Sequence, residues 1–347
     1  MPERGGRRRP VLRDELVTLA HGAGGKATRD LVEVLFLEEL GNEALAPLGD
    51  SAVVSSTVGR LALTTDSYVV RPLVFPGGDI GELAVNGTVN DLAVAGARPL
   101  WLTAGFVLEE GLPVERLRGI VSSMGAAARR AGVPVAAGDT KVVERGKADG
   151  LYVTTAGVGV LDHDLELVPA SVRPGDRVLL SGSLADHGMA VMIARGDLHL
   201  EGDVSSDTAP LNELTAALLG LADGLRWMRD PTRGGLATAL NELASQAALA
   251  IRLWESSLPV KPPVFAACEI LGIDPLYVAN EGKLVAVVAA EAADEALAML
   301  RGHPLGADAV EIGVVEAEPE AMVLLDTALG GSRIVDLLVG DPLPRIC

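Results

Sequence analysis

The feature that most limits what this chain can fold into is an alternation of two periodicities after Leu12. Residues 60–70 alternate apolar and polar side chains like a strand, whereas residues 79–97 carry apolar side chains at helical spacing behind Asp79, a candidate N-cap. The other predicted elements are strands over 100–108, 133–136, 151–160, 177–181 and 284–288, and helices over 113–132, 211–221, 235–247 and 292–300. This alternation predicts an α/β (α+β) fold.

The length of 347 residues predicts two domains, because a single hydrophobic core usually stops growing at about 250–300 residues. We place the boundary near residue 165, between an N-terminal domain over 13–165 and a larger C-terminal α/β domain over 166–335. Residues 1–12 are rich in arginine and lack periodicity, which predicts a disordered basic tail. Residues 336–347 include two prolines close to the end, which predicts an extended, mobile arm.

Charge and composition exclude several classes of function. The 47 acidic and 29 basic residues give a formal net charge of −18, which would repel the phosphate backbone of a nucleic acid. No apolar run reaches the roughly 18 residues of a membrane span, so we expect neither a signal peptide nor a membrane anchor. The two cysteines, Cys268 and Cys347, cannot form a disulfide framework or a thiolate metal site. We therefore expect a protein of the reducing cytoplasm.

The sequence contains neither a P-loop nor a dinucleotide-binding glycine motif after a strand. Instead, four aspartates stand beside small residues near predicted strand ends or helix faces: Asp50, Asp66, Asp91 and Asp139. Mg²⁺ binds one or two carboxylates together with water and substrate phosphates, so such acids could hold a metal–nucleotide complex. Taken singly, each of these aspartates would more often cap a turn.

Two basic residues lie next to such acids and could contact phosphate oxygens. Lys141 follows the segment Gly138-Asp139-Thr140, and Arg233 lies in an Asp-Pro-Thr-Arg-Gly-Gly segment. Each would also suit a structural ion pair at the surface. The glycine-rich residues 21–25 could approach a phosphate through their backbone or could form a hinge.

Two further residues are candidates for chemistry. Glu281 precedes the predicted strand 284–288, where it could act as an active-site base or could simply close a turn. Cys347 ends the chain, and a thiol on a mobile arm could carry a bound group between partners. A terminal cysteine without such a context would more often be incidental.

Considered together, these segments resemble the HypE family of hydrogenase maturation factors over nearly the whole chain, from His21 to Cys347. The resemblance rests on residues 21–25 (HGAGG), 75–81 (FPGGDIG), 138–143 (GDTKVV), 280–283 (NEGK) and 344–347 (PRIC). That family is similar to aminoimidazole ribotide synthetase (PurM) and selenophosphate synthetase. The resemblance therefore implies two α/β domains and a homodimer whose N-terminal, ATP-binding domains pair through their mixed sheets.

The resemblance also implies a reaction. A carbamoyltransferase, HypF, would load a carbamoyl group onto Cys347, and the tail would then enter the ATP site of the protein. Phosphorylation of the carboxamide oxygen and removal of the nitrogen protons would expel phosphate and leave a thiocyanate. The cyanide would pass to an iron held by a complex of HypC and HypD, as a ligand of the nickel–iron hydrogenase centre.

The site residues implied by the resemblance divide into three groups. The first would hold Mg²⁺ and the nucleotide and comprises Asp50, Asp66, Asp91 and Asp139. The second would complete the nucleotide site and comprises Gly24, Gly25, Gly138, Thr140 and Arg233. The third would carry the chemistry, with Lys141 steadying phosphate charge, Glu281 accepting protons and Cys347 bearing the substrate. The chain departs from the family at Ala185, where we expect glycine.

Two other functions remain open at this stage. An enzyme of the same fold could phosphorylate a small molecule as a PurM-like kinase or ligase, in which case activity would survive deletion of the last four residues. A non-catalytic scaffold could instead bind nucleotide and present its tail to partners, in which case ATP would be bound but never hydrolysed.

Overall fold

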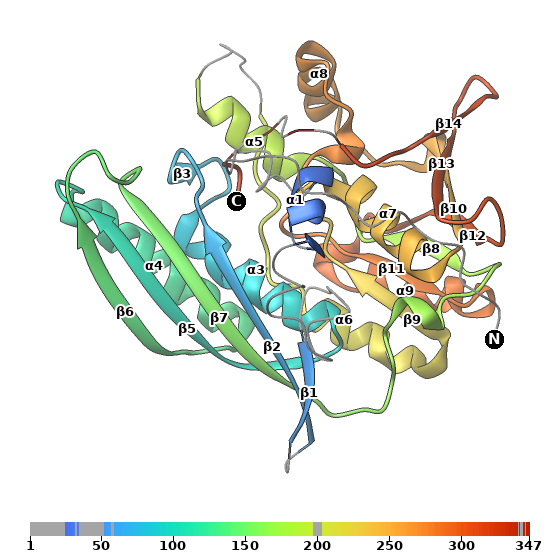
Figure 1. Ribbon diagram of the computed structural model, residues 1–347, viewed down its shortest axis with the longest axis horizontal. Helices are drawn as coiled ribbons and strands as arrows, with labels where there is room; N and C mark the ends of the chain where they lie inside the picture. The colour runs from blue at the N-terminus through green and yellow to red at the C-terminus, as the bar shows by residue number, and fades with distance from the viewer. Residues whose placement is uncertain are drawn as a thin grey trace.

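The computed structural model describes residues 25–31, 33–34, 52–56, 59–196, 203–338, 340, 343 and 345–347. Within these residues the chain forms two large sheets, one in each half, and a short two-stranded pair, β3 (Val74–Phe75) with β4 (Gly78–Asp79). Figure 1 shows the two sheets side by side, with helices packed between and around them. The predicted basic tail, together with Gly24 and Asp50, lies outside the described residues.

The N-terminal sheet has five strands in the order β1-β2-β7-β5-β6. They are β1 (Ala52–Ser56), β2 (Gly59–Tyr68), β5 (Arg98–Glu109), β6 (Val135–Val143) and β7 (Leu151–Leu161). Strands β5 and β6 pair in parallel, and the other neighbours are antiparallel. The sheet is therefore mixed, as the family resemblance implies.

Two helices cover one face of this sheet. Both begin within one residue of the predicted start, but the first ends at Val94 and not at the predicted Ala97. Helix α3 (Ile80–Val94) starts behind Asp79, whose carboxylate accepts the amides of Gly81 and Glu82. Helix α4 (Val114–Ala131) follows Pro113 and ends at Gly132, which adopts the left-handed conformation that favours glycine (φ 69°). Their apolar side chains bury the facing residues of β5 and β7.

The opposite face of the N-terminal sheet is open among the described residues (Figure 1). Along β7, residues alternate between buried and partly exposed side chains, which is the pattern of a sheet covered on one side only. On the open face, Leu63 and Trp101 flank Val158 in register, and about half of each of the two outer side chains is exposed (46% and 52%).

The C-terminal sheet has seven strands in the order β14-β13-β10-β12-β8-β11-β9. They are β8 (Arg177–Leu180), β9 (Leu225–Arg229), β10 (Ala250–Trp254), β11 (Val285–Val288), β12 (Val310–Glu316), β13 (Met322–Asp326) and β14 (Ser332–Ile334). The α-helices around it are α5 (Asp186–Ala194), α6 (Asn212–Leu218), α7 (Gly235–Ala247), α8 (Pro262–Leu271) and α9 (Ala293–Arg301). Helix α7 packs on one face and helices α6 and α9 on the other, so β11 is buried throughout.

Two other predicted elements are also wrong in extent. The strand predicted over 133–136 is β6, which runs on to Val143 and contains Gly138, Asp139 and Thr140 instead of ending before them. An edge strand with an open face tolerates such polar residues. Strand propensity disfavours them, so a prediction from propensity alone ends this strand too early. The helix predicted over 211–221 is α-helical only to Leu218 and continues as a 3₁₀ turn.

None of the helices in the described part of the chain is both long and apolar enough to cross a bilayer.

Candidate active site

The last three residues of the chain are docked against the segment that follows β2. The amide of Val69 donates to the carbonyl of Cys347 at 3.2 Å, and the amide of Arg71 donates to the carbonyl of Arg345 at 3.1 Å. Figure 1 places this end of the chain beside β3 and α5, between the two halves of the molecule. The structure thus holds the predicted arm in a docked position, and its mobility stays a prediction.

Side chains from both domains hold the docked tail. Arg195, at the end of α5, donates to the carbonyls of Arg71 (2.8 Å) and Arg345 (2.6 Å), so one guanidinium bridges both sides of the backbone pairing. The side chain of Arg345 pairs with Asp149 at 2.5 Å. Ile346 is buried against the core, and its carbonyl lies 2.6 Å from Nε2 of His187. The backbone of the tail is therefore held on several sides.

A further positive charge that acts on the tail is Arg233, which lies just before α7. Its pKa is raised chiefly by negative charge at Cys347 and, against the effect of burial, by Asp66 and Glu281. Its Nη2 stands 3.8 Å from the carboxylate of Asp66, at the end of β2. The structure therefore brings four residues predicted from the sequence into one electrostatic cluster: Cys347, Arg233, Asp66 and Glu281.

Glu281 is the most deeply buried acid of this cluster, with 2% of its surface exposed. Its backbone is fixed from both sides, because its amide donates to Asp207 (3.1 Å) and its carbonyl accepts from Asn90 of α3 (3.2 Å). Burial raises the pKa of Glu281 well above its usual range, and the charges of Asp230, Asp207 and Asp66 raise it further. A carboxylate in such a place is a stronger base than one in water.

Asn280 joins the two loops that carry the charged residues. Its side-chain amide donates to the carbonyl of Pro231 (3.0 Å), and its side-chain oxygen accepts from the amide of Ala185 (2.8 Å). Ala185 sits at φ 72°, the left-handed region that favours glycine, which explains why glycine is expected there. The departure at Ala185 thus leaves the hydrogen bond to the active-site loop in place.

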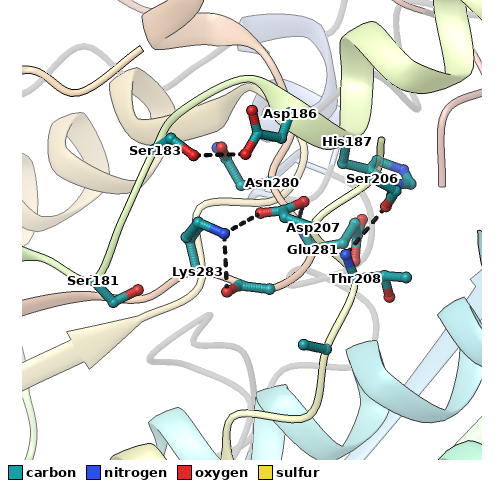
Figure 2. A network of polar contacts seen from close by, with 12 residues as sticks. Ser181, Ser183, Asp186, His187, Ser206, Asp207, Thr208, Asn280, Glu281 and Lys283 are labelled. Carbon is teal, nitrogen blue, oxygen red and sulfur yellow. Dashed lines mark hydrogen bonds and ion pairs between the residues drawn. The ribbon is translucent and has the colours of Figure 1, made fainter. Parts of the chain in front are cut away.

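An ion pair lies beside Glu281, as Figure 2 shows. Lys283 and Asp207 approach to 3.2 Å, with only 13% and 3% of their side chains exposed. Burial alone would raise the pKa of Asp207, but Lys283, His187 and the amide of Glu281 together bring it below its usual value. Asp207 is therefore ionised, and its charge raises the pKa of Glu281.

Two acids of the N-terminal domain, Asp66 and Asp91, accept hydroxyl groups close to this cluster. Asp66 accepts the hydroxyl of Tyr68 at 3.0 Å, and Asp91 of α3 accepts the hydroxyl of Thr64 at 2.6 Å. Burial raises the pKa of Asp66, against the effects of Arg233 and of Tyr68. The pKa of Tyr68 is well above its usual value through burial and through the charges of Asp66, Glu281 and Asp91. Asp66 and Asp91 thus face the same buried tyrosine.

These two carboxylates suit a nucleotide-bound cation better than a permanent metal site. No group of three or more His, Cys, Asp or Glu side chains that could hold a metal ion occurs in the described parts of the chain. Mg²⁺ needs only one or two carboxylates when water and phosphates supply the other ligands. Asp66 and Asp91 therefore fit the second kind of site.

Asp139 and Lys141 lie elsewhere, in edge strand β6. Asp139 is in register with Gly105, Thr154 and Ser67 across the sheet, on the open face, whereas Asp66 belongs to the face that α3 covers. The two side chains pair with each other at 3.1 Å and are about 70% exposed. Within one chain the structure does not bring them to Cys347, and their roles remain predictions.

The predicted glycines that the structure describes make close backbone contacts. A Cβ on Gly138 would stand 2.7 Å from the carbonyl oxygen of Ala104 in β5. A Cβ on Gly25 would stand 2.6 Å from the carbonyl oxygen of Leu338, which also accepts the amide of Lys26 at 3.0 Å. Gly25 thus lets the N-terminal segment pack against the stretch that leads into the tail.

Sequence reasoning did not single out Tyr68, His187 or Asp207. Tyr68 could have been found, because it lies two residues after Asp66 on the same face of a strand. His187 stands between an aspartate and a glycine at the start of a helix, which is a weaker signal. Asp207 lies in a polar stretch without periodicity, and only the tertiary fold brings its carboxylate to the backbone amide of Glu281.

Family profiles match both halves of the chain. The description "AIR synthase related protein, N-terminal domain" matches residues 48–161, and "AIR synthase related protein, C-terminal domain" matches residues 173–325. The fold and the site therefore define a two-domain protein of the AIR synthase-related class. The resemblance to that class predicted from the motifs is confirmed.

Curated relatives and solved structures narrow the class. Carbamoyl dehydratase HypE of Bradyrhizobium diazoefficiens is 55% identical, with 97% of each chain covered. A crystal structure of a HypE–HypF complex matches with a TM-score of 0.84 at 47% identity, over 89% of this chain and 99% of that one. A HypE crystal structure in complex with ATP matches with a TM-score of 0.80 at 46% identity, over 95% and 99%. The chain belongs to the carbamoyl dehydratase HypE family.

Proposed function

We propose that this protein uses ATP to dehydrate a carbamoyl group carried on its own Cys347, giving an S-cyano group. Membership of the HypE family supports this function, and the full-length relatives carry the name carbamoyl dehydratase. One structural observation carries the proposal further. The chain's own end is docked against the segment that follows β2, and Cys347 interacts electrostatically with Arg233, whose charge also acts on the buried Glu281.

The reaction balances with ATP as the only co-reactant. The carboxamide oxygen attacks the γ-phosphorus, so an oxygen–phosphorus bond forms while the bond from that phosphorus to ADP breaks. The nitrogen then gives up both of its protons, one to the active-site base and one to the departing phosphate, and the carbon–oxygen bond breaks as that phosphate leaves. The oxygen of the carbamoyl group ends in phosphate, and the sulfur of Cys347 keeps the nitrile carbon.

The cluster around the tail suggests a role for each residue. Glu281 would accept one of the protons from the carbamoyl nitrogen, since burial and neighbouring acids raise its pKa and thereby its strength as a base. Arg233 would neutralise the negative charge that develops on the phosphorylated oxygen, for which its place beside Cys347 is suited.

We propose ATP as the nucleotide and Mg²⁺ as its cation. A related HypE has been crystallised in complex with ATP, which supports the first. Asp66 and Asp91, one from β2 and one from α3, would hold the cation while phosphate oxygens and water complete its shell. Such a cation would supply charge neutralisation for the transferred phosphoryl group.

We further propose that the protein works as a homodimer in the cytoplasm. The open apolar face of the N-terminal sheet, with Leu63, Trp101 and Val158, favours pairing of two such faces. Asp139 and Lys141 lie on the same face, so their predicted contacts with nucleotide would be made in the site of the second subunit.

The partners we propose follow the course of the group on Cys347. A carbamoyltransferase of the HypF kind would load the tail, and a solved HypE–HypF complex of a relative supports this step. The cyanide would then pass to an iron held by a HypC–HypD complex, for the nickel–iron centre of hydrogenase.

The mass of the C-terminal peptide tests the proposed function. The protein is incubated with HypF, carbamoyl phosphate, Mg²⁺ and ATP, and the peptide that ends in Cys347 is then weighed. We expect the mass of a carboxamide adduct that loses one water only when the ATP can be hydrolysed. An unmodified tail, together with full ATP turnover after deletion of the last four residues, would instead indicate a small-molecule kinase or ligase.

A further inference from the structure

A buried histidine touches the tail immediately before its reactive residue. His187, near the start of α5, is 0% exposed, and its Nε2 lies 2.6 Å from the carbonyl oxygen of Ile346. Its Nδ1 lies 2.8 Å from the hydroxyl of Ser206, and the ring of Phe75 packs against it edge-on at 5.4 Å. The imidazole is thus held on three sides in one orientation.

The hydrogen bonds allow only one neutral form of this ring. A carbonyl oxygen can only accept, so Nε2 of His187 must carry the proton and donate to Ile346. Nδ1 is then an acceptor and takes the hydroxyl proton of Ser206, whose oxygen accepts the amide of Thr208 at 3.1 Å. Burial is the largest influence on the pKa of His187 and lowers it, which keeps the ring neutral.

The same short segment fixes the candidate base. Residues 206–208 bind His187 through Ser206 and the backbone of Glu281 through Asp207, which accepts the amide of Glu281 at 3.1 Å. Thr208 accepts from Asn86 of α3 at 3.1 Å, which ties the segment to the N-terminal domain. Figure 2 shows these residues gathered around one stretch of chain. The tail and Glu281 are therefore located with respect to one common support.

We propose that His187 is a positioning residue for the group on Cys347 and that Ser206 selects the ring tautomer that can donate to the tail. The hydrogen bond from Nε2 fixes the peptide unit that precedes Cys347, and the shared segment 206–208 fixes Glu281 relative to it. The inference rests on the proposed function, because positioning matters only if the tail carries the substrate. Displacement of a reacting group by about 1 Å can cost roughly a hundredfold in rate.

Two variants of similar size separate positioning from mere packing. In His187→Gln the side-chain nitrogen can reach the place of Nε2 and donate to Ile346, whereas in His187→Asn it reaches only the place of Nδ1. The measurement is a single turnover of dehydration, starting from chain already carbamoylated on Cys347, followed by mass spectrometry. We expect His187→Asn to slow dehydration by about tenfold to a hundredfold, His187→Gln to recover most of the rate and Ser206→Ala to fall between them. Loading by HypF should proceed at the wild-type rate in all three.

A matched control and the wild type make the result decisive. His303→Asn makes the same substitution at a histidine whose Nδ1 accepts the amide of Leu305, remote from the tail, and it should leave both steps unchanged. Equal dehydration rates in the wild type and His187→Asn would overturn the inference, as would equal losses in His187→Asn and His187→Gln. Failure of the wild-type chain to convert its carbamoyl group would overturn the proposed function itself.

Discussion

Two lysine–aspartate pairs of nearly equal length occupy opposite environments in this molecule. Lys283 and Asp207 approach to 3.2 Å beside Glu281, with 13% and 3% of their side chains exposed. Lys141 and Asp139 approach to 3.1 Å on the open face of the N-terminal sheet, with 71% and 70% exposed. Water and salt screen the exposed pair, whereas the buried pair acts on its neighbours at close to full strength. Burial, more than spacing in the sequence, decides which pair shapes the chemistry.

The largest expected effect is on the rate of dehydration and concerns Glu281, which lies next to the buried lysine–aspartate pair. Glu281→Gln keeps the shape of the side chain and its backbone bonds but removes the proton acceptor. We expect dehydration of preloaded chain to fall by about a hundredfold to ten-thousandfold. Loading by HypF should be unchanged, because it does not use this base. Quantification of cyanated and carbamoylated tail peptide by mass provides the measurement, and a wild-type rate would remove Glu281 from the mechanism.

The next largest effect tests the two lysine–aspartate pairs directly, through the free energy of unfolding. Lys283→Met leaves the charge of Asp207 buried without its partner, and we expect a loss of about 3–5 kcal/mol in the free energy of unfolding. Lys141→Met, the matched change in the exposed pair, should cost less than about 1 kcal/mol. Urea unfolding followed by circular dichroism measures both. Similar losses in the two variants would show that burial does not distinguish the pairs.

A smaller effect tests the packing around the acids of the N-terminal domain. A Cβ on Gly87 of α3 would stand 2.2 Å from the hydroxyl of Tyr68, so Gly87→Ala must displace the tyrosine that donates to Asp66. We expect a loss of about 1–3 kcal/mol. Gly119 of α4 has open space at the same position, and Gly119→Ala should stabilise the helix by up to about 1 kcal/mol. Thermal unfolding of the two variants should therefore shift in opposite directions.

The smallest effect compares the two thiols. Burial raises the pKa of Cys268 to about 11, with further contributions from Asp274 and Glu269. Its thiolate fraction at pH 8 is then on the order of one in a thousand, and the residue lies in the core. We expect iodoacetamide to label Cys347 at pH 8 and to leave Cys268 unmodified until the pH approaches 11. Peptide mapping over a pH series checks this, and equal labelling at pH 8 would contradict it.

Much of the fold could be predicted because its signals are local. Helices α3 and α4 are marked by Asp79 at the start of one and by Gly132 at the end of the other, and both signals act within one turn. Strand β6 was predicted too short, because its polar residues lie on a face whose exposure depends on the whole sheet. Local patterns thus identify an element more reliably than they predict its extent.

The site was predictable in part for the same reason. Glu281, Arg233 and Asp66 stand in recognisable motifs, and the fold gathers them into one electrostatic cluster in which Arg233 also interacts with Cys347. The contact between His187 and Ile346 joins residues 159 positions apart, and local periodicity cannot predict such a contact. The difference between the Asp207 and Asp139 pairs is likewise invisible in the sequence, because it lies in burial, which only the tertiary fold determines.

The docked tail has a consequence for the kinetics of such an enzyme. A substrate that belongs to the chain is present at a fixed effective concentration, set by the tether and independent of dilution. Saturation with respect to the carbamoyl group then has no meaning, and each molecule processes one group per loading. The product also remains on the same tether, so repeated turnover depends on how quickly an acceptor removes the cyano group from the tail.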